Sequence, residues 1–163
     1  MRLTLLILWL TVPLAVAAYH FGPGQDRLKH DSAAAHLAAA RAASAEDHAP
    51  AIAALEAALA DLPEADVAES RQIRLALAKL RVESGDLPKG HDELVALFNE
   101  LDGDAAADPA LRDQVRQALA TAKYYITWLM RLEGLPEETW EPEIEASRQH
   151  FRLLDEQAEK GQN

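Results

Sequence analysis

Apolar residues recur at helical spacing on both sides of a turn at Gly85. Spacings of three and four residues place them on one helix face, so residues 75–101 predict two amphipathic helices joined as a hairpin. A hairpin this short cannot bury its own apolar face, and it therefore predicts similar hairpins packed on either side. The apolar face consists of Leu77 and Leu80 before the turn and of Leu87, Leu94, Leu97, Phe98 and Leu101 after it.

The same spacing continues along the rest of the chain. Helices are expected over residues 32–46, 50–62, 109–133 and 141–161. The last three have a proline in their first turn, and Pro63 and Gly134 follow the second and third. A composition rich in Ala, Leu, Glu and Arg favours helix over strand. Together with the two helices around Gly85, these segments predict an all-α domain over residues 32–163 with about six helices in three antiparallel hairpins.

The N-terminus differs in composition from this domain. Residues 3–18 carry no charge, and the small residues Ala15 and Ala17 form a pattern typical of signal peptidase sites. An uncleaved anchor over residues 3–21 is the alternative, because a membrane-spanning helix needs about 20 apolar residues. We therefore expect a signal peptide or membrane anchor over residues 1–18 and a connector over 19–31. Either reading predicts export to the bacterial cell envelope, as a periplasmic or membrane-anchored protein.

Charge and residue content argue against several functions. The formal net charge of -11 disfavours nucleic-acid binding, which needs a clustered basic surface. The chain has no cysteine, and its 6 histidines include no pair at i,i+4 spacing that would hold a metal on one helix face. The acidic run over residues 137–145 lacks the alternating oxygen ligands of a calcium loop and suits a helix start instead. We expect no enzymatic activity, no cofactor and no resident metal.

Two segments carry a resemblance to a known family. The pattern of small and large residues from Ala51 to the closing Pro63 resembles the second half of a tetratricopeptide repeat (TPR). The next hairpin is similar over more of its length, with Leu77 and Ala78 where the family's paired helices cross, and Gly85 at the turn. The resemblance covers residues 32–101 well. It implies a short TPR-like solenoid of stacked hairpins.

The third hairpin matches this pattern loosely. Equivalent small residues would be Ala51, Gly90 and Ala146, and their spacing exceeds the family repeat of about 34 residues. Aligned on its turn at Gly134, the third hairpin has Thr127 where the family places small residues. A plain six-helix bundle is the alternative fold.

The resemblance also implies a binding surface, because the first helix of each TPR hairpin lines a concave groove. We therefore expect a non-enzymatic scaffold that binds a protein partner of unknown identity. The alternatives are a small structural bundle or accessory subunit that self-associates, with Tyr124 and Trp128 buried, and a metal- or small-molecule-binding envelope protein. The candidate partner-binding residues are Gln72, Leu75, Lys79 and Val82 from the second hairpin and Tyr124, Trp128 and Arg131 from the third.

Overall fold

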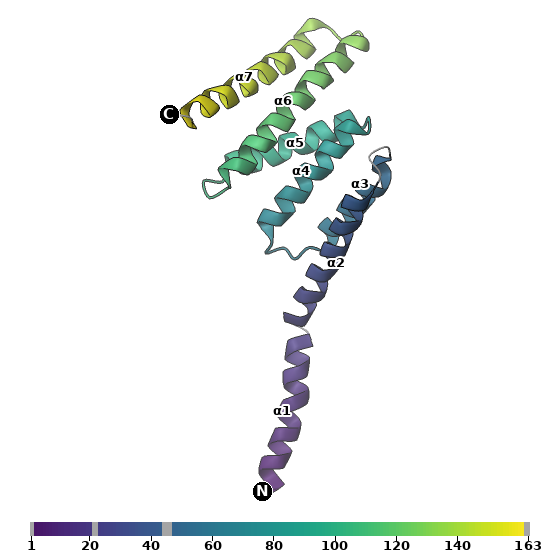
Figure 1. Cartoon of the computed structure of the whole chain (residues 1–163), viewed down its shortest axis with the longest axis vertical. Helices are drawn as coiled ribbons and strands as arrows, with labels where there is room; N and C mark the ends of the chain where they lie inside the picture. Colours follow the sequence, from purple (N-terminus) through teal and green to yellow (C-terminus); the bar gives the residue numbers. More distant parts are fainter. Residues whose placement is uncertain (1, 21–22, 44–46, 162–163) are drawn as a thin grey trace.

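The computed structural model shows an all-α protein in which six helices pack together and one extends away from them (Figure 1). It describes the backbone of residues 2–20, 23–43 and 47–161, and the side chains of these except residues 2–8, 10, 20, 23 and 161. The helices in this part of the chain are α1 (Arg2–His20), α2 (Pro23–Ala42), α3 (His48–Asp61), α4 (Val67–Glu83), α5 (Leu87–Asp102), α6 (Pro109–Leu132) and α7 (Glu137–Gly161).

The helices pack in the order in which they occur along the chain. Among the described residues, each of α1–α6 contacts the helix that follows it, and the one further helix pair in contact is α4 with α6. Helices joined by short connections run antiparallel, as in the pair α6 and α7 (Figure 1). The predicted all-α class and the six sequentially packed helices are confirmed.

Helix α1 stands apart from this stack. Among the described residues it contacts α2 alone (Figure 1). The predicted signal peptide or anchor depends mainly on residues 3–8 and 10, whose side chains lie outside those described. Within the described residues, none of the helices combines the length and the apolar character needed to cross a membrane.

Two helices begin earlier than the sequence predicts. Residues 23–31, assigned above to a connector, form the first half of α2. Helix α7 begins at Glu137 rather than at 141, so that Pro142 lies inside it. Pro142 is the sixth residue of α7, beyond the first four backbone N–H groups that have no partner within a helix, so it removes one hydrogen bond of the second turn. Both starts were misplaced because Gly-Pro and Glu-Pro pairs also suit the first turns of a helix.

Other helix ends agree with the sequence signals. The Asp108 side chain accepts a hydrogen bond from the backbone N–H of Ala110 at 3.0 Å, directly before Pro109 in the first turn of α6. Gly85 and Gly134 have φ angles of 95° and 75°, the left-handed region in which side chains other than glycine are strained. These local signals were sufficient to place the hairpin turns.

The core follows the stack as two adjoining clusters. One lies between α4, α5 and α6 around the fully buried Leu94, Leu97 and Leu101. The other lies between α2, α3 and α4 around Leu55 and Leu77. The predicted apolar face of residues 77–101 therefore faces the core. Apolar residues nearer the C-terminus follow this less closely, since Leu132 at the end of α6 is 79% exposed and Phe151 of α7 is 43% exposed.

Small residues allow two pairs of helices to approach closely. A Cβ atom on Gly90 of α5 would lie 2.8 Å from the Ala78 carbonyl oxygen of α4, so glycine is required for this crossing. Between α6 and α7 the buried Ser147 hydroxyl donates a hydrogen bond to the Ala120 carbonyl at 2.8 Å. The small residue of the third hairpin is thus Ser147 rather than the predicted Ala146, which is partly exposed.

Candidate functional site

A groove runs between α4 and α6, the first helices of the second and third hairpins. It consists of two adjoining cavities, a first of about 350 Å³ and a second of about 340 Å³, and both are lined by Lys79 and Gln114. We call it the α4–α6 groove. Its α6 side is formed by Leu111, Gln114, Gln117, Ala118, Thr121 and Tyr125.

The structure places all four of the α4 candidates in this groove. Gln72 and Leu75 line the first cavity, Val82 lines the second, and Lys79 lines both. Leu75 is buried and Val82 partly buried, so they form the floor, whereas Gln72 and Lys79 are exposed. This side of the groove combines an apolar floor with polar side chains above it.

The three α6 candidates lie elsewhere. Tyr124, Trp128 and Arg131 do not line the α4–α6 groove, and Tyr125 is the aromatic residue at its end. Adjacent residues on a helix point about 100° apart, so a prediction that is wrong by one position selects residues on a different side of the helix. The residues missed, Gln114, Gln117, Thr121 and Tyr125, recur at helical spacing, and that stripe was the signal available in the sequence.

The groove offers free hydrogen-bonding groups and an unpaired cation. Within the described part of the chain, the carboxamides of Gln72, Gln114 and Gln117 make no hydrogen bond. The Lys79 ammonium group likewise has no ion-pair partner among these residues. Two carboxylates also line the groove, Asp108 in the first cavity and Glu83 in the second. Three exposed carboxamides without a protein partner and an ammonium group around an apolar floor suit a polar, elongated ligand.

A further cavity extends this surface toward the first hairpin. A space of about 350 Å³ lies between α2 and α4 and is lined on the α2 side by Leu37 and Arg41. Gln72 and Ala76 line both this cavity and the first cavity of the α4–α6 groove. The accessible face therefore continues across all three hairpins.

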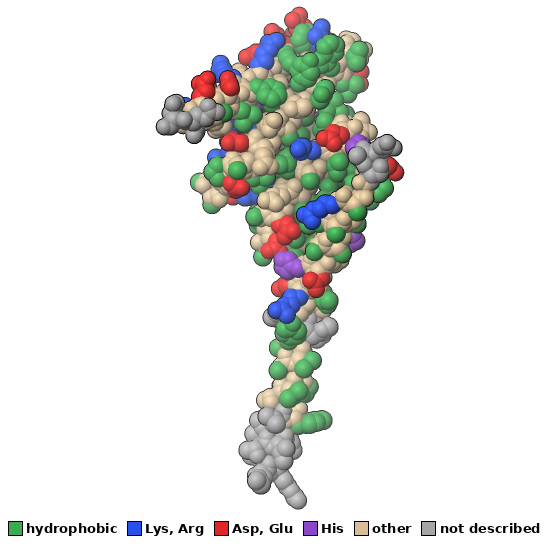
Figure 2. Space-filling view, viewed as in Figure 1, with side chains coloured by type: hydrophobic (Ala, Val, Ile, Leu, Met, Phe, Trp, Pro, Cys, Tyr) green, Lys and Arg blue, Asp and Glu red, His purple; other side chains and the backbone are tan. Residues whose placement is uncertain are grey.

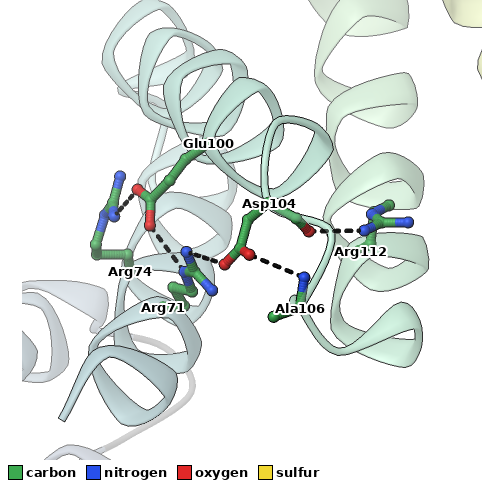
Figure 3. A network of polar contacts seen from close by, with 6 residues as sticks. All are labelled: Arg71, Arg74, Glu100, Asp104, Ala106 and Arg112. Carbon is green, nitrogen blue, oxygen red and sulfur yellow. Dashed lines mark hydrogen bonds and ion pairs between the residues drawn. The ribbon is translucent and has the colours of Figure 1, made fainter.

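A network of ion pairs holds α4 against the loop that precedes α6 (Figure 3). Arg71 of α4 pairs with Glu100 at 2.8 Å and with Asp104 at 2.9 Å, and Arg74 pairs with Glu100 at 2.5 Å. The Asp104 carboxylate also accepts a hydrogen bond from the Ala106 backbone N–H at 2.9 Å. This network fixes the loop that leads into α6 and thereby the separation of the two groove walls.

The network also changes the acidity of its carboxyl groups. Hydrogen bonds from Arg71 and Arg74 lower the pKa of Glu100 below its ordinary value. The Ala106 backbone N–H, followed by Arg71, lowers the pKa of Asp104. A lowered pKa means that the folded state favours the charged carboxylate, so these groups stabilise the fold while they remain ionised.

The pKa of a histidine on α7 is also lowered, but for a histidine this favours the neutral form in the folded state. His150 packs edge-on against Phe98 of α5 with ring centroids 5.1 Å apart, and Arg116 of α6 lies 5.5 Å from the same Phe98 ring. Burial lowers the pKa of His150, and the positive charges of Lys123 and Arg116 lower it further. The folded chain therefore holds this imidazole neutral at the contact between α5, α6 and α7.

We expect acid to weaken the fold in two stages. Below pH 6.5 the unfolded chain takes up a proton at His150 that the folded chain resists, so stability falls until the lowered folded-state pKa is passed. Below pH 4.5 the unfolded chain protonates at Glu100 before the folded chain does, and the stabilisation from the network is lost. Urea unfolding at neutral, mildly acidic and strongly acidic pH measures both stages.

Two variants separate these stages. Between neutral and mildly acidic pH, His150→Phe should lose less stability than the natural chain. Between mildly and strongly acidic pH, Glu100→Gln should lose less stability than the natural chain. A His150→Phe chain with an unchanged mild-acid loss would show that this histidine does not contribute.

A second surface lies at the turn between α6 and α7 and contains the α6 candidates that the groove does not. Tyr124, Tyr125 and Trp128 are 43%, 51% and 49% exposed. Arg131 stands over the ring of Trp128 at 5.5 Å and over that of Trp140 at 5.0 Å. We call Tyr124, Tyr125, Trp128, Leu132, Leu135 and Trp140 the distal aromatic surface.

The site and fold together define an all-α stack of helical hairpins with an open groove. No protein-family model, curated protein or solved structure matches this chain. In the part of the chain that is described, no group of three or more His, Cys, Asp or Glu side chains is placed to hold a metal ion. The α4–α6 groove and the distal aromatic surface are the two candidate sites for a partner.

Proposed function

We propose that this protein is a non-enzymatic scaffold that binds an extended segment of a protein partner in the α4–α6 groove. The observation that carries the proposal is the set of free carboxamides, Gln72, Gln114 and Gln117, beside an apolar floor. A carboxamide both donates and accepts hydrogen bonds, as each peptide unit of an extended chain does. The floor, which includes Leu75 and Val82, accommodates apolar side chains from the same segment.

The arrangement of the helices supports a TPR-like solenoid as the finer description of the fold. The contact between α4 and α6 and the cavity between α2 and α4 support an arrangement in which the first helices of successive hairpins share one face. The uncharged run over residues 3–18 supports the further proposal that the scaffold is exported to the cell envelope. Intact mass of the chain purified from envelope and cytoplasmic fractions tests that location.

Peptide selection tests the groove directly. Peptides selected from a random phage-displayed library on the purified chain should bind the Gln114→Ala plus Gln117→Ala variant at least about tenfold more weakly, as expected when central interface contacts are removed. Fluorescence anisotropy of the labelled peptides gives the dissociation constants. Circular dichroism shows whether both chains are equally folded.

Matched substitutions on α7 provide the control. Gln149 and Gln157 are exposed, and Gln149→Ala plus Gln157→Ala should leave the affinity within about twofold. Selected peptides that bind the groove variant and the natural chain equally would overturn the proposal. So would a selection that enriches no peptide.

A further inference from the structure

We propose that the distal aromatic surface is a second binding site, which takes a cationic amphipathic segment of a protein partner. Hydrophobic side chains gather at the α6–α7 end of the molecule in Figure 2. Besides the half-exposed aromatic rings, Leu132 is 79% and Leu135 39% exposed. Contiguous apolar surface of this kind on a soluble domain is typical of an interaction site.

The charge around this surface selects the sign of the partner. Glu133, Glu137, Glu138 and Glu141 surround the turn, are exposed, and have no ion-pair partner among the described residues. The helix dipole accounts for acids in the first turn of α7, but not for Glu133 at the end of α6. Positive charge on the partner would be attracted by all four carboxylates.

Arg131 shows that these rings accept a cation. Its guanidinium lies over the rings of both Trp128 and Trp140, which come from different helices. Guanidinium and ammonium groups are attracted to the faces of aromatic rings, and Trp gives the strongest interaction. A partner segment with arginine or lysine on one side and leucine-like residues beside them would use both the carboxylates and the rings.

The backbone that presents this surface is held in place before any partner arrives. The N–H of Leu135 donates to the Met130 carbonyl at 3.0 Å and that of Gly134 to the Arg131 carbonyl at 3.1 Å. Little ordering is therefore needed on binding, which favours affinity. Of the aromatic residues on this surface, Tyr125 also lines the α4–α6 groove, so the two sites adjoin but differ in chemistry.

Tryptophan emission offers a direct test. The chain has 3 tryptophans, and Trp9→Phe leaves Trp128 and Trp140 as the reporters. A short fluorescein-labelled peptide of leucine and arginine at helical spacing should change this emission, whereas a leucine–glutamate peptide should not. In anisotropy, Trp128→Ala should weaken leucine–arginine binding at least about tenfold, and Tyr124→Ala should weaken it to a smaller degree.

Charge variants show whether the peptide is attracted by the carboxylates near this surface or by the net negative charge of the whole chain. Glu137→Gln plus Glu141→Gln should weaken binding about fivefold, while Glu64→Gln plus Asp102→Asn, with the same change in net charge, should change it less than about twofold. An equal loss in both pairs would overturn the proposal. Equal binding of the two peptides, or unchanged binding by Trp128→Ala, would do so as well.

Three further outcomes would assign the surface to a different occupant and so overturn the proposal. The first is binding to phosphatidylcholine vesicles that competes with the peptide. The second is a concentration-dependent dimer in sedimentation that Trp128→Ala abolishes. The third is a loss of leucine–arginine binding in the Gln114→Ala plus Gln117→Ala variant equal to that of Trp128→Ala, since the ligand would then occupy the groove. A negative result for the distal aromatic surface does not contradict the groove proposal, which is tested with separately selected peptides.

Discussion

Replacing Gly90 with valine should lower the free energy of unfolding by about 3 kcal/mol, the upper end of the usual cost of overpacking. Even the first side-chain atom would lie 2.7 Å from the Val82 Cγ2 atom and 2.8 Å from the Ala78 carbonyl oxygen. The carbonyl belongs to the α4 backbone and cannot move aside without displacing the helix. Because Val82 lines the α4–α6 groove, the same change should also weaken the binding of groove-selected peptides.

Graded substitutions make this expectation sharper. Gly90→Ala introduces the Cβ alone and gains helix propensity, so its cost should be smaller than that of valine. At Gly103 a Cβ would lie no closer than 3.4 Å to its nearest neighbour and φ is -80°, so Gly103→Ala should change stability by less than about 0.5 kcal/mol. Urea unfolding monitored by circular dichroism gives all three values. A Gly90→Val chain with an unchanged unfolding midpoint would contradict the close crossing.

Removing the Arg81 side chain should cost about 3 kcal/mol. Its side chain is 6% exposed and pairs with Glu56 of α3 and Glu93 of α5, so this guanidinium joins three helices. Truncating one member of a buried ion pair leaves charges without their counterion, which typically costs 3–5 kcal/mol. The lower end applies because the Glu56 side chain is 50% exposed and can be solvated.

A rescue experiment distinguishes unpaired charge from lost packing. Arg81→Ala combined with Glu56→Gln and Glu93→Gln should recover more than half of the stability lost in Arg81→Ala alone, because the packing defect is the same and no carboxylate is left unpaired. Arg152→Ala is the control, since that arginine is 71% exposed and its ion pair with Glu156 should contribute less than about 0.5 kcal/mol. Equal losses in Arg81→Ala and in the rescued chain would attribute the effect to packing.

Much of the local structure was predictable because it depends on neighbours in the chain. The Asp108 cap and the left-handed Gly85 are properties of a few consecutive residues, and both are observed. The leucine stripe of α5 was predictable for the same reason, since helical spacing alone brings Leu94 and Leu97 to one face. The starts of α2 and α7 were misplaced because a proline near a helix start is compatible with either assignment.

The sequence predicted the groove residues on α4 but not those on α6. On α4 the groove residues follow from the positions of the buried Leu75 and Ala78. On α6, alignment to the turn at Gly134 selected Tyr124 and Trp128, whereas the groove is lined by Tyr125 on the same helix. The error arose because the third hairpin does not repeat the packing of the second.

The sequence by itself determined that this protein is a series of amphipathic helices in hairpins, since periodicity and turn residues act locally. Only the tertiary structure decided which side of α6 faces α4, and hence that the candidate residues belong to two surfaces. It also decided that Ser147, and not Ala146, meets α6. The physical reason is that the rotation of a helix about its axis is set by side chains that interlock across helices, and those contacts join residues far apart in the chain.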